Sequence, residues 1–455
     1  MMVRPSGREC SASLRAQRSN PASLAAPESW TASSLSLLAM TRPRGTAEGG
    51  SLQWRRLLVA LAFLLLAPAP ARADFQKFLA ELWPDAQKAG VSRKTFDAAT
   101  AGLTPDMSLP ELAIPGRPEK PRAAQAEFVQ RPADYMAAGG LATLATRGQK
   151  LAGEHKATLA ALERKSGVPG PVLLAIWARE TNYGAAPLRY NAIRVLATHA
   201  YTGRRRDYFR AQLLYGLKIL EAGDVSLAGM KSSWAGAMGQ TQFMPYEFFK
   251  YGADFDGDGR RDIWNSVPDA LASAANQLLD KGWRPGKGWA YEVVPPATMD
   301  CTEAEPERVL PVRDWLKRGF KPAGGRKVAD ADLAEPASLF LPAGTYGPAF
   351  LTLKNFYVIK SYNFADLYAL YVGHLGDRIA GRGGFSRPWD KLVQLKTTDL
   401  EAMQKGLAAA GLYTDKIDGK AGQKTRVALG AFEKANGLTL DCWPDAEDLA
   451  RMSKR

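Results

Sequence analysis

Apolar residues recur every three or four positions along most of this chain, which is the spacing of one face of an α-helix. The spacing predicts helices over residues 74–101, repeatedly within 125–222, from about 268 to 281, and over 355–380. Residues 283–350 differ, because Pro and Gly are frequent there and Val-rich pieces lie between them. The pattern therefore predicts a mainly α (α+β) fold in which a small β-containing insert interrupts the helices.

The end of the chain has the pattern of a separate small domain. Residues 381–398 contain a Gly-rich stretch and predict a linker, and residues 399–455 return to helical spacing. Leu400, Met403 and Leu407 share one helix face, and later Asp-Gly and Asn-Gly pairs supply turns. We expect a domain of three short helices, which either binds a partner or packs as a helical cap on the rest of the protein.

The start of the chain carries the pattern of an export signal. Basic residues precede an apolar run over 57–67, and the triplet Ala71-Arg72-Ala73 offers small residues for cleavage. The run is too short for a stable transmembrane anchor, and the prolines after it argue against a buried helix. We expect residues 1–73 to be a leader, of which 1–39 is disordered or wrongly started, and the mature protein to be periplasmic.

Charge and cysteines add two expectations. The formal net charge of +14 favours a polyanionic partner, but no Lys/Arg run is interleaved with aromatic residues, which weakens a nucleic-acid interpretation. Cys301 and Cys442 follow the leader and would enter an oxidising compartment. They either form a disulfide there or remain two separate buried thiols.

One carboxyl group lies on an apolar helix face. In SGVPGPVLLAIWARETNYG (166–184), Val172, Ile176 and Glu180 align at four-residue intervals, so Glu180 continues a face that points inward. Tyr183-Gly184 should end the helix just beyond it, near the negative end of the helix dipole. Burial and the dipole both predict a raised pKa, as a general acid requires. The alternative is a structural ion pair between Glu180 and a neighbouring arginine.

The segment SWAGAMGQTQFMP (233–245) combines small residues with neutral hydrogen-bonding side chains. Glycine lets a sugar approach the backbone closely, and Ser and Gln can hydrogen-bond its hydroxyl and acetamido groups. The same composition also suits a Gly-rich packing turn.

The loop DFDGDGRRDIWN (254–265) has the spacing of a calcium-binding loop. Its last position is Asn265 and not the usual bidentate Glu, so Asp269 would supply the remaining carboxylate. The alternative role of Asp269 is a capping box with Ser266 at a helix start. We expect a structural Ca²⁺ and no cofactor for catalysis. The candidate ligands are the side chains of Asp254, Asp256, Asp258 and Asp269 and the backbone carbonyl of Arg260.

These motifs, with WARETNYG (177–184) and NFYVIKSYNFADLYAL (355–370), resemble the membrane-bound lytic murein transglycosylase B family, glycoside hydrolase family 103. The resemblance covers most of residues 74–380 and implies a lysozyme-like catalytic domain with a deep cleft. It identifies Glu180 as the single catalytic glutamate. One position departs, because Gln277 stands where a relative carries a cleft tyrosine. The resemblance implies substrate contacts from Ser233, Met238, Gln242, Tyr362, Asn363 and Tyr368.

The function implied is a lytic transglycosylase acting on the glycan strands of peptidoglycan. Glu180 would protonate the β-1,4 glycosidic oxygen between MurNAc and GlcNAc and then take the proton of the muramoyl C6 hydroxyl, which gives a 1,6-anhydro product. Apart from Glu180, no Asp or Glu in WARETNYG (177–184) or SWAGAMGQTQFMP (233–245) offers the second carboxylate that hydrolysis usually needs. The alternatives are a muramidase on the same fold and a non-catalytic wall-binding protein.

Residues 399–455 resemble the three-helix peptidoglycan-binding module, including its DGKAGQKT core (418–425). Such a module would tether the enzyme to its polymer and raise the local concentration of substrate. Other cell-wall enzymes are further candidate partners.

Overall fold

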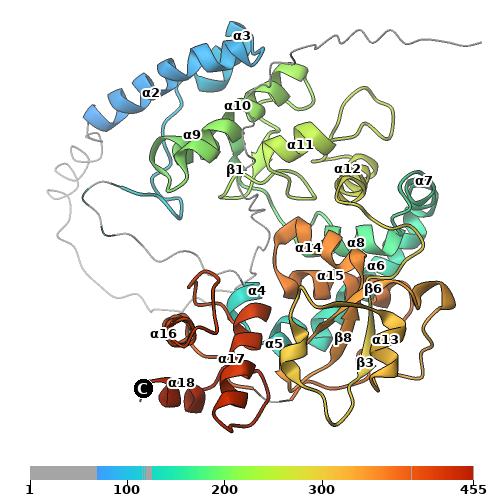
Figure 1. The fold of residues 1–455 in the computed structure, drawn as a ribbon. Helices are drawn as coiled ribbons and strands as arrows, with labels where there is room; N and C mark the ends of the chain where they lie inside the picture. Colours follow the sequence, from blue (N-terminus) through green and yellow to red (C-terminus); the bar gives the residue numbers. More distant parts are fainter. Residues whose placement is uncertain (1–68, 115, 117, 119–125, 391, 454–455) are drawn as a thin grey trace, which may run out of the picture. The chain divides into compact units, whose positions relative to one another are not determined.

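The computed structural model describes residues 69–114, 116, 118, 126–390 and 392–453 (Figure 1). The apolar run over 57–67 lies outside this part, so the expected leader stays a prediction. The triplet Ala71-Arg72-Ala73 falls within helix α2. Among the described residues, no helix is both long enough and apolar enough to cross a bilayer.

Helices dominate the residues on both sides of the insert (Figure 1). Before it lie α2 (Ala69–Lys88), α3 (Arg93–Thr100), α4 (Ala126–Val129), α5 (Pro132–Tyr135), α6 (Ala138–Glu154), α7 (Lys156–Ser166), α8 (Gly170–Thr181), α9 (Ala192–Thr202), α10 (Arg206–Ala222), α11 (Pro245–Tyr251) and α12 (Val267–Asp280). After it lie α14 (Lys354–Asn363) and α15 (Asp366–Ile379). Two short strands, β1 (Tyr190–Asn191) and β2 (Lys231–Ser232), pair antiparallel.

Two of the expected helices are each broken in two. The helix expected over 74–101 divides into α2 and α3, because Gly90 takes a left-handed φ of 88° and Ser92 then caps α3 by accepting the N–H of Thr95. The single helix expected over 355–380 is wrong, since α14 ends where Phe364 takes a φ of 64° and α15 begins after Ala365. An aromatic residue gives no turn signal in a sequence, so this second break was not predicted.

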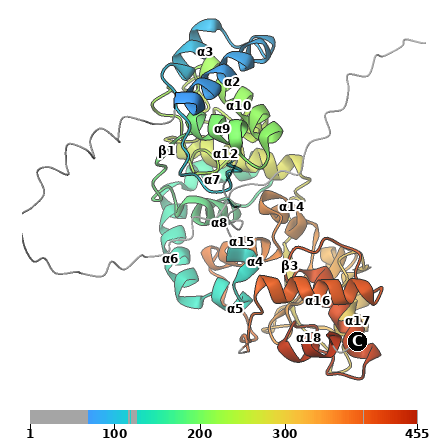
Figure 2. The same cartoon turned by 90° about the vertical axis from the view of Figure 1, so that its left-hand side faces the viewer.

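Helix α8 lies inside the largest hydrophobic core. It packs against α6, α12 and α15, and Figures 1 and 2 both draw α8 beside α15. Leu173, Leu174 and Ile176 are completely buried, as expected for a helix with neighbours on several sides. The helix that carries Glu180 is therefore held rigidly by its surroundings.

The insert is built on a five-stranded antiparallel sheet, which confirms the expected β-containing unit. The strand order is β4-β6-β8-β3-β5, with Ala290 of β3 opposite Thr352 of β8 and Leu339 of β6 opposite Leu351 of β8. Helix α13 (Val312–Lys317) packs its fully buried Trp315 into a second core beneath the sheet. The strands of this sheet are β3 (Ala290–Val294), β4 (Val309–Pro311), β5 (Lys321–Pro322), β6 (Pro336–Phe340) and β8 (Ala349–Thr352). A further short strand, β7 (Pro342–Thr345), lies between β6 and β8 in the sequence and is not part of this sheet.

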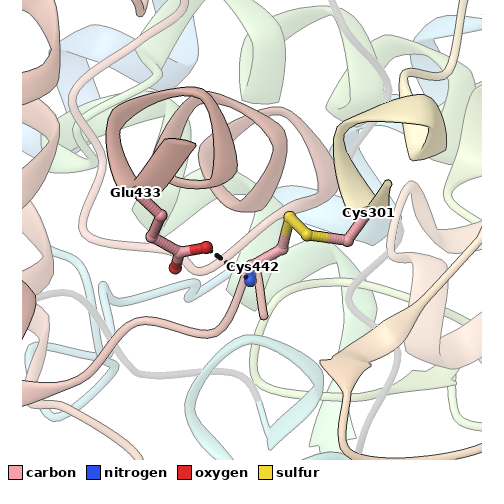
Figure 3. A group of neighbouring side chains, drawn as sticks. All are labelled: Cys301, Glu433 and Cys442. Atoms are coloured by element: carbon pink, nitrogen blue, oxygen red, sulfur yellow. Dashed lines mark hydrogen bonds between the residues drawn. A yellow bond between two sulfur atoms is a disulfide. The ribbon is translucent and has the colours of Figure 1, made fainter. Parts of the chain in front are cut away.

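The C-terminal residues form the expected three helices, α16 (Thr397–Ala409), α17 (Gln423–Ala435) and α18 (Ala446–Met452), around a small core of their own. They are joined to the insert by a disulfide between Cys301 and Cys442, which decides between the two alternatives left by the sequence (Figure 3). Glu433 lies beside the disulfide and accepts the backbone N–H of Cys442 (Figure 3). Burial raises the pKa of the Glu433 carboxyl to about 8. The side-chain amide of Gln423 also donates to the backbone oxygens of Ala304 and Leu339. The C-terminal unit therefore has its own core and is also packed on the insert.

Candidate active site

Glu180 lies in the last turn of α8 and is 1% exposed, as the apolar stripe predicts. Its Oε1 accepts a 2.6 Å hydrogen bond from the hydroxyl of Tyr368 on α15. Its Oε2 is buried and has no hydrogen-bond partner among the described residues. One carboxyl oxygen is thus fixed by a buried donor, whereas the other makes no hydrogen bond within the described part of the chain.

The electrostatics of Glu180 favour the protonated acid. Burial raises the pKa of this carboxyl to about 8, and this effect outweighs the hydrogen bond from Tyr368 and the positive charge of Arg179, which both lower it. The nearby carboxylates of Glu127 and Glu247 raise the pKa further. The alternative of a structural ion pair is not what the structure shows, because the carboxylate within ion-pair distance of Arg179 belongs to Glu127.

The end of α8 is shaped by consecutive left-handed residues. Asn182, Tyr183 and Gly184 have φ values of 51°, 56° and 74°, so the helix stops directly after Glu180 and Thr181, as expected. The hydroxyl of Thr181 then donates to the backbone oxygen of Gln240 at 2.7 Å. This contact packs the Gly-rich segment 233–245 against the C-terminal end of α8.

Within this segment, the side chains expected to contact substrate first stabilise the loop itself. The Ser233 hydroxyl accepts the N–H of Ala237, and the Gln242 amide donates to the backbone oxygen of Gly239. Met238 is fully buried, and its backbone pairs with Phe243. The described contacts of these side chains are those of a packing turn, and a sugar-binding role for the three residues stays a prediction.

The late helices bring two predicted tyrosines to the site. Tyr362 donates from its hydroxyl to the backbone oxygen of Thr241 at 2.8 Å, which connects α14 to the Gly-rich segment. Its ring stacks on that of Tyr368 with centroids 6.2 Å apart and planes 11° from parallel. The break at Phe364 places the two tyrosines on successive helices, Tyr362 at the end of α14 and Tyr368 near the start of α15.

Asn363 has a neighbour that the sequence did not indicate. Its side-chain amide donates to Oε1 of Glu127 at 3.1 Å, and Oε2 of Glu127 lies 3.7 Å from the guanidinium of Arg179. Glu127 comes from the one-turn helix α4, where no periodicity marks it. Arg179 lies inside the WARETNYG motif, and its position next to Glu180 is the signal that could have drawn attention to it.

Among the described residues, Glu180 is 1% exposed, so the side chains around it enclose its carboxyl group and no open cleft leads to it there. Gln277, the position that departs from the family pattern, is also buried, at 1% exposure. A cavity of about 210 Å³ lies elsewhere and does not include the carboxyl group. It is lined by Arg131, Ala133, Asp134, Trp389, Asp390 and Leu392.

The aspartate loop brings together only part of the expected metal ligands. Carboxylate oxygens of Asp254, Asp256 and Asp269 lie within 4.8 Å of one another. Asp258 instead pairs with the side chain of Arg260 at 2.8 Å. Asp269 is completely buried and accepts backbone N–H groups of Phe255, Asp256 and Asp262, and its own N–H is capped by Ser266.

This mainly helical domain, in which the buried helix α8 ends in Glu180 beside the stacked rings of Tyr362 and Tyr368, is of the lysozyme-like class. Residues 74–377 match the family described as the transglycosylase SLT domain, and residues 396–452 match the putative peptidoglycan binding domain. The chain therefore belongs to the transglycosylase SLT domain family.

Three relatives illustrate this membership. The chain is 32% identical over 225 residues to membrane-bound lytic murein transglycosylase B of Escherichia coli K12, an alignment that spans 47% of this chain and 58% of that relative. The crystal structure of SltB3 from Pseudomonas aeruginosa in complex with NAG-anhNAM-pentapeptide is 37% identical, covers 83% of this chain and 99% of that one, and has a TM-score of 0.73. Soluble lytic transglycosylase SltB1 from the same organism is 26% identical, covers 68% and 98%, and has a TM-score of 0.54.

Proposed function

We propose that this protein is a lytic transglycosylase that cleaves the β-1,4 bond between MurNAc and GlcNAc in peptidoglycan and leaves a 1,6-anhydro-muramoyl end. The observation that carries the proposal is the state of Glu180. Its carboxyl is buried, has a pKa raised to about 8 by that burial, and has one oxygen without a partner among the described residues. Such a group is protonated at neutral pH and can donate its proton to an arriving glycosidic oxygen.

Both proton transfers can use the same carboxyl group. Glu180 gives its proton to the glycosidic oxygen as the bond from that oxygen to muramoyl C1 breaks, and the muramoyl acetamido group stabilises the positive carbon. The ionised Glu180 then accepts the proton of the muramoyl C6 hydroxyl while the oxygen of that hydroxyl bonds to C1. The carboxyl group ends protonated as it began, and no water is consumed. The Tyr368 hydroxyl stabilises the carboxylate that exists between the two steps.

The surrounding carboxylates support transglycosylation over hydrolysis. A hydrolase usually needs a second carboxylate to activate water or form a glycosyl intermediate. Glu127 and Glu247 are the buried carboxylates that act electrostatically on Glu180. Glu127 is engaged by Asn363 and Arg179, and Glu247 accepts the backbone N–H of Met244. Both have structural partners, so Glu180 is proposed as the single acid and base.

The sugar contacts proposed for this site follow from its lining. Tyr362 and Tyr368 offer aromatic rings for the sugar C–H faces. Ser233, Gln242 and Asn363 offer neutral hydrogen-bonding groups, and Met238 offers apolar surface. All six are buried, so substrate binding requires these side chains to move apart.

A structural Ca²⁺ is proposed for the aspartate loop. Asp254, Asp256 and Asp269 provide converging oxygen atoms only, which fits a hard cation. The backbone carbonyl of Arg260 is a further proposed ligand. Asp258 fits less well, because its carboxylate is occupied by the Arg260 side chain. The ion would stabilise the loop that precedes α12 and would take no part in the reaction.

We further propose that residues 74–380 form the catalytic domain, that 381–398 connect it to the peptidoglycan-binding domain 399–455, and that the protein works in the periplasm. The match of residues 396–452 to a putative peptidoglycan binding domain supports glycan strands as its partner. Its disulfide favours an oxidising compartment.

Product analysis of purified peptidoglycan tests the proposal. Mass spectrometry of the released fragments should find anhydro ends, which are one water lighter than the reducing ends that a muramidase releases. Glu180→Gln should abolish cleavage while sacculus binding persists. Reducing ends would establish the muramidase, and binding without cleavage by the wild type would establish the non-catalytic alternative.

A further inference from the structure

Glu127 is a buried carboxylate at the site to which the mechanism gives no role. Its side chain has no exposed surface, although it lies on a helix of only four residues. A buried charge is costly unless it is paired, and here the Asn363 amide and the Arg179 guanidinium occupy its two oxygens. Both partners belong to elements that shape the site around Glu180. The contacts with Asn363 and Arg179 therefore help to set the position of Glu127.

Arg179 explains why a carboxylate is needed here. It directly precedes Glu180 on α8, and its guanidinium lies over the rings of Tyr135 and Tyr371 at 4.8 and 5.3 Å from their centroids. The side chain is only 17% exposed. A positive charge favours the ionised form of a nearby carboxyl group, so an unpaired Arg179 at this depth would lower the pKa of Glu180. Glu127 supplies the opposite charge beside the guanidinium of Arg179.

We propose that Glu127 is a positioning residue of the transglycosylase site, which neutralises Arg179 and fixes the amide of Asn363. This inference rests on the proposed function of Glu180. As a consequence, Glu180 lies next to an Arg179–Glu127 pair of no net charge and not next to an unpaired arginine. Glu127 itself touches no reacting atom in this arrangement.

Helix α4 is also fixed from its outer side. Phe128, the residue after Glu127, lies under the ammonium group of Lys420 at 3.7 Å from the ring centroid. Lys420 belongs to the DGKAGQKT core of the C-terminal unit. The one-turn helix is thus held between the C-terminal unit and the buried pair, which keeps Glu127 in place.

Several charged or titratable groups act on Glu180 and bear on the test, and the buried hydroxyl of Tyr362 is also close enough to interact with its charge. Arg179 and Tyr368 lower the pKa of Glu180, whereas Glu127 and Glu247 raise it. Glu247 lies on α11, and its contact with Met244 does not involve α4. Removal of the charge of Glu127 alone therefore leaves the charges of Arg179 and Glu247 in place and should lower the pKa of Glu180.

The sharpest test is the pH dependence of kcat/KM for Glu127→Gln on purified peptidoglycan. Glutamine keeps an oxygen that can accept the Asn363 amide but removes the charge. Because the acid must be protonated, activity falls as the pH rises through the pKa of Glu180. We expect this alkaline limb to move to lower pH by about one unit, which corresponds to a tenfold change in the ionisation equilibrium. A limb at the wild-type position would overturn the proposal.

A double variant separates charge balance from simple structural support. Glu127→Gln combined with Arg179→Gln removes both charges, so the alkaline limb should return to within a few tenths of a unit of the wild type. If the single variant does not fold, the double variant carries the test, and a limb displaced to lower pH in it contradicts the proposal. Absence of anhydro products from the wild type would instead refute the proposed function, whatever these limbs show.

Discussion

The hydroxyl of Tyr368 donates a 2.6 Å hydrogen bond to a carboxyl group that is 1% exposed, and its removal is the most informative single-atom change at this site. Tyr368→Phe deletes the donor and keeps the ring that stacks on Tyr362. No water can readily replace the lost hydroxyl, since both side chains are buried. The ionised form of Glu180 therefore loses its direct donor.

The size of the effect follows from the strength of that bond. A hydrogen bond to a charged group contributes about 1.5–3 kcal/mol, which corresponds to roughly one to two pKa units. The pKa of Glu180 starts at about 8, so the alkaline limb of kcat/KM should move above pH 9. The rate at neutral pH should fall about 10- to 100-fold, because the carboxylate formed after the first proton transfer is less stable.

The assay is the release of soluble fragments from purified peptidoglycan between pH 5 and about 10, with the limb position fitted for each variant. Tyr357→Phe is a matched control, because its hydroxyl contacts Thr352 and not Glu180. The control should keep the wild-type limb. A Tyr368→Phe limb that stays in place or moves to lower pH would refute the assignment of this hydroxyl. Tyr368→Phe and Glu127→Gln should thus shift the limb in opposite directions.

Three further outcomes follow from buried groups. Glu180→Gln should unfold at a higher urea concentration than the wild type, and the difference between the two urea midpoints should widen as the pH rises from 5 to 8. Burial raises the pKa of Glu180 to about 8, so its contribution to wild-type stability is greatest at low pH and is lost as the pH rises through this range. Equal midpoints at pH 8 would contradict this. Asp269→Ala should lower the melting temperature measured by calorimetry, because backbone donors such as Asp262 N–H lose their acceptor. Chelation of Ca²⁺ should lower the melting temperature of the wild type but not of the variant, and no effect of chelation on either protein would count against the metal. Reduction of the Cys301–Cys442 disulfide should lower the unfolding free energy by about 2–5 kcal/mol in urea titrations, and an unchanged midpoint would show that the bridge adds no stability.

The features that sequence reasoning predicted are those with local signals. Glu180 continues a stripe with Val172 and Ile176, and its burial is confirmed. The β-containing insert is confirmed because Pro, Gly and Val mark it clearly. The three C-terminal helices are confirmed because their apolar spacing and turns are regular.

The features that were missed depend on contacts between distant residues. Glu127 lies 236 residues from Asn363, and a one-turn helix offers no period to reveal it. The break at Phe364 needs a left-handed aromatic residue, which no turn rule favours. The pair of Asp258 with Arg260 takes one expected metal ligand out of the cluster, because a long basic side chain two positions away can fold back on it.

The central claim is that a single buried acid, Glu180, transfers the proton twice and that no water enters the product. It is tested most directly by digestion of purified peptidoglycan in ¹⁸O-labelled water, with the wild type beside Glu180→Gln and mass spectrometry of the new glycan ends. The account predicts unlabelled anhydro-muramoyl ends from the wild type and no new ends from the variant. Reducing ends that carry ¹⁸O, or anhydro ends released at wild-type rate by Glu180→Gln, would contradict it.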